Sequence, residues 1–343
     1  MRRLLNTLFV LTEDSYLSLE GENVVVQKGE ETIGRFPLHT LESILYFGYK
    51  GASPALMGAC AGYNIGLCFF TPNGRFLARV CGESRGNVLL RKEQYRVSGS
   101  ESECCLLARN FIVGKLYNAR WVLERATRDH PMRVDVGRLK KASKELAAAA
   151  KTAANATGLE ELRGIEGEAA ARYFSTIDEL LLQNKEEFFF QTRSRRPPRD
   201  NVNAMLSFVY SILANDCAAA LESIGLDAYV GFIHRDRAGR ASLALDLMEE
   251  LRPVFADRFV ISCVNNRIMQ PSHFVKSENG SVTMNDAGRR EFLTAYQSRK
   301  KEQVQHPFLG EKLPWGLVPY VQSLLLARCL RGDLDAYPPF LWK

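Results

Sequence analysis

The chain has 343 residues, of which 46% are hydrophobic, and this length and composition predict about two globular domains. Its formal charge of +6 is mild, so the composition permits a polyanionic partner without requiring one. The eight cysteines form no CxxC pair, and no signal peptide or long apolar span is found, which argues against secreted disulfide proteins and membrane proteins. We therefore expect a cytoplasmic protein with no membrane partner.

The first part of the chain is predicted to be β. It contains short runs rich in β-branched and aromatic residues, separated by glycines. These runs cover residues 8–11, 16–20, 23–28, 32–36, 41–48, 65–70 and 75–80, with a small helix expected after Ser53 and Pro54. We predict a β-sandwich-like domain over residues 1–85. Because it holds no cluster of acids or histidines, we assign it to assembly or dimerisation.

From residue 86 the spacing of apolar residues becomes helical. Helices are predicted at 88–97, 104–128, 136–154, 162–182, after residue 200, from Ala241 to a stop at Pro253, at 255–268, at 285–301 and at 318–330. Thr157 and Glu160 resemble a capping box, and Asn279-Gly280 indicates a hairpin within 274–284. The fold class is thus α+β, with a larger all-helical catalytic domain over 86–343.

A candidate site lies between residues 229 and 253. His234 ends a short apolar run, a basic turn follows, and the next helix carries Asp246 and Glu249 three residues apart, on one face. A carboxylate this close to the leucine stripe would be partly buried and would need a partner, such as a cation shared with His234. Each residue alone has an ordinary structural explanation, but together they favour a metal site.

Glu166 is the third candidate ligand. Gly164 and Gly167 flank it, and each glycine costs a helix up to about 1 kcal/mol relative to alanine. We interpret this as a helix start that a second helix approaches closely. A plain acid at a helix start is the alternative.

Arginines bracket these acids in the sequence. Four of them (Arg193, Arg195, Arg196 and Arg199) crowd a loop that Pro197 and Pro198 break, and three more (Arg235, Arg237 and Arg240) follow His234. Arginine binds phosphates with its planar guanidinium group, so both sets are candidate DNA contacts. The alternative for the first set is a solvated linker.

Three motifs carry a resemblance to a known family: GIEGEAAARYF (164–174), the arginine and proline loop before NAMLSFVYS, and GFIHRDRAGRASLALDLMEELRPVFADR (231–258). They closely resemble the universal CRISPR-associated integrase, the larger protein of the spacer-acquisition complex. The resemblance covers essentially the whole chain. The run LALDLMEELRP and the ending PWGLVPYVQSLLLARCLRGDLDAYPPF are most similar to the form found in bacterial type I-C systems.

The resemblance implies a DNA endonuclease and integrase that joins the 3′ hydroxyls of a short DNA to the repeat array. It also implies that Glu166, His234 and Glu249 hold Mg²⁺ or Mn²⁺, with Asp246 as a supporting residue or a ligand of a second metal. The implied partners are double-stranded DNA, a second copy of the chain and a small second adaptation protein. Two alternatives remain open: a non-catalytic nucleic-acid-binding protein, and a metal-dependent nuclease acting on RNA.

Overall fold

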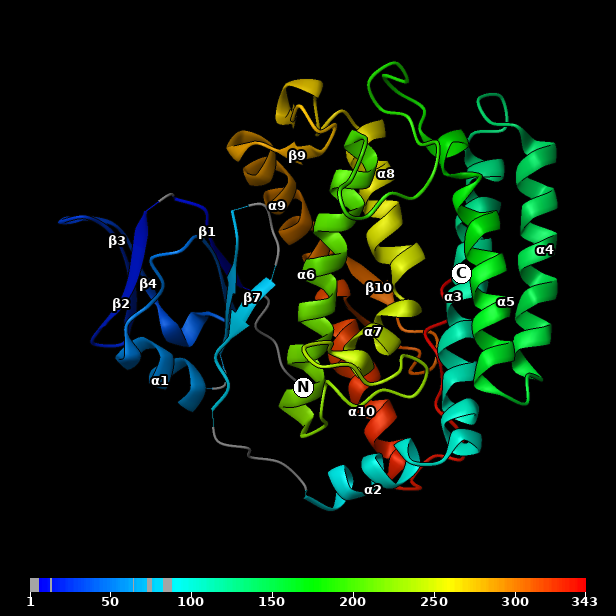
Figure 1. Ribbon diagram of the computed structural model, residues 1–343, viewed down its shortest axis with the longest axis horizontal. Helices are drawn as coiled ribbons and strands as arrows, with labels where there is room; N and C mark the ends of the chain where they lie inside the picture. Colours follow the sequence, from blue (N-terminus) through cyan, green and yellow to red (C-terminus); the bar gives the residue numbers. More distant parts are fainter. Residues whose placement is uncertain (1–5, 13, 64, 73–75, 83–87) are drawn as a thin grey trace.

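The computed structural model describes residues 6–12, 14–63, 65–72, 76–82 and 88–343, and it has two parts that lie side by side (Figure 1). The smaller part carries the N-terminal strands, and the larger part consists mainly of helices. The predicted boundary between residues 85 and 86 lies outside the described residues, as does the end of the predicted turn at 71–74.

The N-terminal part contains two β-sheets and one α-helix. One sheet is an antiparallel meander in the order β2-β3-β4, and the other is mixed, in the order β1-β5-β6-β7, with β1, β5 and β6 parallel. The elements are β1 (Thr7–Val10), β2 (Ser15–Glu20), β3 (Asn23–Lys28), β4 (Glu31–Pro37), β5 (Ser43–Phe47), α1 (Pro54–Gly62), β6 (Gly66–Phe70) and β7 (Phe76–Arg79). Ser53 caps α1 as predicted, because its side chain accepts a hydrogen bond from the Leu56 amide.

The mixed sheet contributes to two hydrophobic cores. Along β5, Ile44 and Tyr46 face the N-terminal core, while Leu45 and Phe47 face the helical part, as the two-residue period of a strand requires. The meander and α1 close the N-terminal core. The predicted β-sandwich is therefore corrected to two sheets and a helix around one core, with the larger sheet partly parallel and covered on its other face by helices.

The helical part comprises nine α-helices in the described residues 88–343. They are α2 (Val88–Ser98), α3 (Glu101–Asp129), α4 (Val136–Ala154), α5 (Leu159–Phe174), α6 (Asn201–Ile224), α7 (Ser242–Glu249), α8 (Arg258–Asn265), α9 (Asp286–Lys301) and α10 (Val318–Leu330). This part also contains a π-helical segment at Arg252–Asp257 and short 3₁₀ turns at Ile177–Leu180, Pro271–His273 and Trp315–Leu317. One more 3₁₀ turn, Leu38–Thr40, lies in the N-terminal part.

Three sequence predictions are wrong in this part. It is not all-helical, because it contains the predicted hairpin β8 (Phe274–Lys276) and β9 (Val282–Met284) and a second hairpin, β10 (Gln303–Gln305) and β11 (Lys312–Pro314). Pro253 does not end the helical structure, which continues through the π-helical segment into α8. Gly158 and not Thr157 caps α5, and the Thr157 amide donates to Glu161 instead of Glu160.

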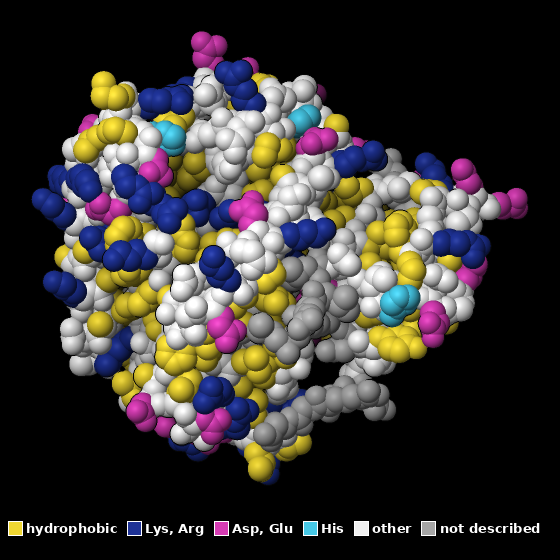
Figure 2. Space-filling model, turned by 180° about the vertical axis from the view of Figure 1, so that it is seen from behind, with side chains coloured by type: hydrophobic (Ala, Val, Ile, Leu, Met, Phe, Trp, Pro, Cys, Tyr) yellow, Lys and Arg dark blue, Asp and Glu magenta, His cyan; other side chains and the backbone are white. Residues whose placement is uncertain are grey.

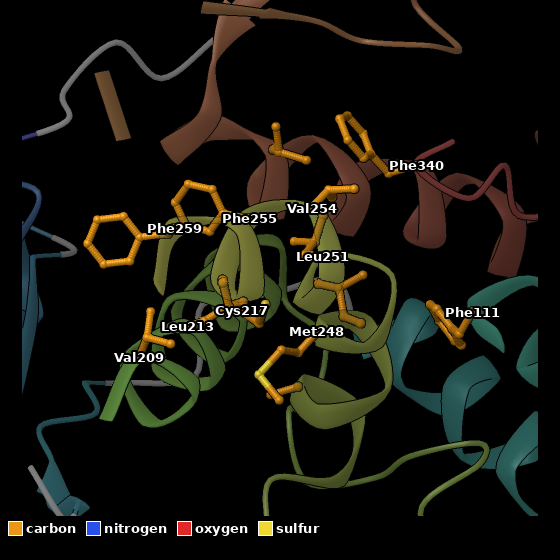
Figure 3. Packing of buried hydrophobic residues seen from close by; sticks show 14 of the residues in the cluster. Phe111, Val209, Leu213, Cys217, Met248, Leu251, Val254, Phe255, Phe259 and Phe340 are labelled. Atoms are coloured by element: carbon orange, nitrogen blue, oxygen red, sulfur yellow. The ribbon is translucent and has the colours of Figure 1, made fainter. Parts of the chain in front are cut away.

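Helix α6 runs through the centre of the helical part. Its residues Val209, Leu213 and Cys217 lie close to α7 and the segment that follows, where Met248 and Phe255 belong to the same hydrophobic cluster (Figure 3). By length and composition α6 could cross a membrane, but 67% of the apolar window is buried inside the protein. Its packing is that of a core helix.

The C-terminal segment 337–342, which we call the C-terminal clasp, is bound to α3 and to the end of α7. Phe340 donates its amide to the Glu250 carboxylate at 2.8 Å, and the Tyr337 hydroxyl also donates to Glu250. Asn118 on α3 donates to the Phe340 carbonyl at 2.7 Å and accepts from the Trp342 amide at 2.8 Å. The clasp thereby fixes the residue that directly follows Glu249.

Candidate metal site in the helical part

Helix α7 presents its two acids from a buried position. It begins at Ser242, one residue after the predicted start, and Leu243 and Leu247 are buried in the core. Asp246 is fully buried, and Glu249 is 5% exposed. Because an isolated ionised carboxylate is costly to bury, each acid must have charged or hydrogen-bonding partners.

Asp246 organises the loop that carries His234. One carboxylate oxygen accepts hydrogen bonds from the amides of Phe232 at 2.6 Å and Ile233 at 3.1 Å. The other accepts from the His234 amide at 3.0 Å and lies 2.6 Å from His234 Nδ1. Both oxygens therefore have hydrogen-bonding partners, and Asp246 supports the histidine; its role as a ligand of a second metal stays a prediction.

The same contact orients the imidazole ring. With Nδ1 donating to Asp246, the proton is held on Nδ1 and Nε2 keeps its lone pair for a ligand, as in carboxylate-supported metal histidines. Burial alone would lower the pKa of His234, but the hydrogen bond to Asp246 and the nearby charge of Glu249 outweigh it and raise the pKa. In the doubly protonated ring the second proton is on Nε2, so metal binding there displaces a proton that is held more firmly than usual.

Glu249 is surrounded by positive charge. Arg252 donates to both of its oxygens, at 2.8 and 3.1 Å, and the Lys115 ammonium lies 2.6 Å from Oε2. Burial raises the pKa of Glu249, but the charges of Arg252, Lys115 and His234 dominate and hold the pKa well below its ordinary value. The carboxylate is therefore ionised although it is buried.

Glu166 and Glu249 form ion pairs with the same lysine, Lys115. Glu166 lies in the middle of α5, not at a helix start, and it forms an ion pair with the Lys115 ammonium that also contacts Glu249. A Cβ added at Gly164 or Gly167 would have no neighbour within 4 Å, so no second helix approaches there. The close approach predicted for these glycines is wrong.

The predicted ligands fit a divalent cation in donor type. Two carboxylates and an imidazole nitrogen suit Mn²⁺ or Mg²⁺. Among the residues that the structure describes, no group of three or more His, Cys, Asp or Glu side chains is placed to hold a metal as it stands. The ammonium of Lys115 bridges Glu166 and Glu249 and supplies a positive charge between them.

Sequence reasoning missed Lys115 and Arg252. Lys115 is a single basic residue inside the apolar run FIVGKLYNA of α3, and it is 6% exposed. A lysine at a core position of a helix indicates a buried partner, so this signal was present in the sequence. Arg252 is also buried, and its guanidinium carbon lies 4.5 Å from the centre of the Tyr210 ring.

The predicted phosphate-binding arginines differ in their surroundings. Arg193 is directed inward, where it donates to Asn203 at 2.7 Å and Ser207 at 3.1 Å, and Arg199 donates to the Asn279 carbonyl at 3.0 Å. Arg195 and Arg196 are exposed. In the second set, Arg237 is exposed, Arg235 forms an ion pair with Glu160, and Arg240 donates to the Arg235 carbonyl.

The fold and the site define an α+β protein with N-terminal strands and a largely helical second part, in which Lys115 pairs with the two acids Glu166 and Glu249. The family model described as "CRISPR associated protein Cas1" matches residues 8–298. The chain belongs to this family of CRISPR-associated proteins.

Relatives and solved structures agree with this assignment. The CRISPR-associated endonuclease Cas1 1 of Chlorobaculum tepidum is 48% identical over 100% of both chains, and Cas1 3 of Thermus thermophilus is 38% identical over 97% of this chain and 96% of its own. A casposase bound to integration product has a TM-score of 0.83 at 22% identity, covering 98% of this chain and 93% of its own. A Cas1 protein from Thermotoga maritima has a TM-score of 0.82 at 22% identity, covering 95% and 97%. The two structural matches show the fold.

Proposed function

We propose that the protein is a divalent-metal-dependent DNA endonuclease and integrase that inserts short DNA spacers into a CRISPR repeat array by 3′-hydroxyl attack on phosphodiesters. The observation that carries this proposal is the convergence of Glu166 and Glu249 on one cation position, with His234 Nε2 left for a ligand. The names of the curated relatives support endonuclease activity. The casposase bound to integration product supports integration through its similar fold. The type I-C subtype remains a prediction from the motifs at 243–253 and 314–340.

Glu166, His234 and Glu249 would hold Mg²⁺ or Mn²⁺. When bound, the metal supplies Lewis-acid polarisation of the scissile phosphoryl oxygen and charge stabilisation of the leaving oxygen. Asp246 holds His234 in the orientation that exposes Nε2, and Arg252 keeps the Glu249 carboxylate ionised. The Glu166 side chain is 27% exposed, so the DNA backbone would reach the site from the side of Glu166.

The partners follow from the same proposal. A single site cannot grip both ends of a donor and a target, so we propose a homodimer built by the N-terminal part, two of which are bridged by a small second adaptation protein. Some structural neighbours are complexes of Cas1 with Cas2, of which one contains this fold as 36% of a longer chain. Double-stranded DNA is the proposed substrate, and Arg195, Arg196 and Arg237 are its candidate phosphate contacts.

The test mixes the chain, its small partner, a duplex with free 3′ hydroxyls, a repeat-containing plasmid and Mn²⁺. We expect covalent joining that is lost with dideoxy 3′ ends and in Glu166→Ala, His234→Ala and Glu249→Ala. Glu168→Ala is the matched control, because Glu168 lies on the same helix and its side chain is 75% exposed. All variants should keep the wild-type circular dichroism spectrum.

Four results would contradict the proposal. Plasmid nicking without a joined product would indicate a nuclease, and turnover of RNA alone would favour the RNA-directed alternative. Full activity of any of the three alanine variants would remove that residue from the site. DNA binding that is unaffected by Glu166→Ala, with no cleavage by the wild type, would indicate a non-catalytic binding protein.

A further inference from the structure

Lys115 is placed where a lysine is rarely found. It lies in the middle of α3 between buried residues such as Ile112 and Leu116, and its side chain is 8% exposed. Lysine is almost never buried to this degree unless its charge is paired. The partners of Lys115 therefore determine why it is tolerated there.

Those partners are the two acids of the candidate metal site. The ammonium lies 2.6 Å from Glu249 Oε2 and forms an ion pair with Glu166, so one cation joins side chains from α5 and α7. Arg252 contacts Glu249 and has no ion pair with Glu166 in the described residues. Without Lys115, the Glu166 carboxylate would face that of Glu249 with no cation between them, and like charges this close repel.

We propose that Lys115 is a resident cation of the site: it holds Glu166 and Glu249 together in the metal-free protein and competes with the divalent metal for them. This inference rests on the proposed function, since it assigns the residue that occupies the metal position before loading. Its consequence is that Lys115 raises the stability of the metal-free protein and lowers the affinity of the site for the metal. Removing the ammonium should weaken the metal-free fold and strengthen metal binding.

The experiment compares wild type with Lys115→Met, which keeps the length and apolar stem of the side chain. In EDTA, we expect the melting temperature to fall by about 5 °C or more, because a buried charge pair loses one partner. Saturating Mn²⁺ should remove most of that deficit. Calorimetric titration with Mn²⁺ alone should show affinity increased about tenfold or more, since the metal no longer displaces two ion pairs.

Two further variants keep the test decisive. Lys115→Met/Glu166→Gln removes the Glu166 charge that the single variant leaves without an ion pair, while Glu249 keeps Arg252, so the double variant should regain melting temperature in EDTA even if the single variant folds poorly. Lys140→Met is the matched control, because Lys140 is paired with Glu124 on the surface and its side chain is 47% exposed. It should change neither the melting temperature in EDTA nor the Mn²⁺ affinity.

The outcomes separate this inference from the proposed function. If wild type and Lys115→Met bind Mn²⁺ with equal affinity, or the variant binds it more weakly, the role of Lys115 is overturned while a metal site remains. If neither protein binds Mn²⁺, the proposed metal-dependent function fails as well. An unchanged melting temperature in EDTA would show that Lys115 does not hold the acids together.

Discussion

Gly231 is the residue that lets the histidine loop lie against α7. A Cβ at this position would come within 2.8 Å of the Ser242 Cβ and 2.9 Å of Asp246 Oδ2. Real Cβ atoms are almost never this close to other atoms, so any side chain would push the loop away from Asp246. The three amide hydrogen bonds that orient His234 therefore depend on the absence of a side chain at the residue directly before them.

Glu250 makes the stability of the protein depend on pH. Burial raises the pKa of Glu250 to about 7 from an ordinary value of 4.5, although hydrogen bonds from Tyr337, Gln322 and Phe340 act in the opposite direction. The unfolded chain loses this proton near pH 4.5, whereas the folded protein keeps it until about pH 7. Raising the pH between these values therefore favours unfolding.

We expect this group to lower the free energy of unfolding by roughly 2 kcal/mol between pH 5 and pH 7.5. Urea denaturation of wild type and Glu250→Gln at both pH values measures the effect. The advantage of wild type over the variant should shrink by about that amount as the pH rises, because glutamine does not titrate. A difference that is constant with pH would show that Glu250 titrates normally.

At the scale of elements, the arginine loop between the 3₁₀ turn at 177–180 and α6 contains arginines in two kinds of surroundings. Arg193 is held by Asn203 and Ser207 and lies over the Tyr210 ring, so it joins the loop to α6. Arg195 and Arg196 extend from the surface. We therefore predict different effects on DNA binding and on stability.

Arg195→Ala/Arg196→Ala should weaken DNA binding regardless of sequence and flatten the slope of log K against log salt by up to about 1.8, or 0.9 for each lost phosphate contact. Arg193→Ala should instead cost about 1–3 kcal/mol of stability, because buried acceptors lose their donor. Fluorescence anisotropy over a salt series and urea denaturation measure the two effects. An unchanged slope in the double variant would indicate a solvated linker.

The sequence predicted elements better than the contacts between them. The helix at 136–154 has the predicted bounds, because the helical spacing of its apolar residues and the positions of its lysines can be read from the sequence alone. The strands β10 and β11 have three residues each, too few for an alternating pattern to be recognised. Helical structure continues past Pro253 because the π-helical segment accommodates a proline near its start, which no local rule indicates.

The site was predictable in part for the same reason. His234, Asp246 and Glu249 share one stretch of chain, so local patterns could group them. Glu166 is indicated by its flanking glycines and by the resemblance, not by its place beside the other residues. The bridge formed by Lys115 depends on three helices meeting, and no spacing within the sequence encodes that geometry.

At the scale of the whole molecule, basic side chains lie over the helical part on the face that Figure 2 shows, while the N-terminal part exposes apolar side chains. Strand β4 is an edge of its sheet, and Ile33 and Phe36 on it are 46% and 37% exposed. Unpaired backbone groups beside exposed apolar residues favour pairing with another chain. We therefore place the proposed homodimer contact at β4.

Light scattering after gel filtration tests this contact. Wild type should elute with the mass of a dimer, and Ile33→Glu should halve that mass while keeping the melting temperature. Tyr63→Glu is the control, since Tyr63 is 64% exposed and follows α1 in the same N-terminal part. A dimeric Ile33→Glu protein would place the interface elsewhere.

The C-terminal clasp has a consequence for the order in which the protein is made. Every residue of the candidate site precedes the clasp in the chain, yet Glu250 accepts hydrogen bonds from Tyr337 and Phe340, and Asn118 exchanges hydrogen bonds with Phe340 and Trp342. While a ribosome is still making this segment, Glu250 keeps Gln322 as a donor and Asn118 keeps the Glu250 carbonyl as an acceptor, but both lack their partners in the clasp. We therefore expect the segment around Glu249 to be fixed only after nearly all of the chain has been synthesised, so an unfinished polypeptide would lack a fully formed candidate site.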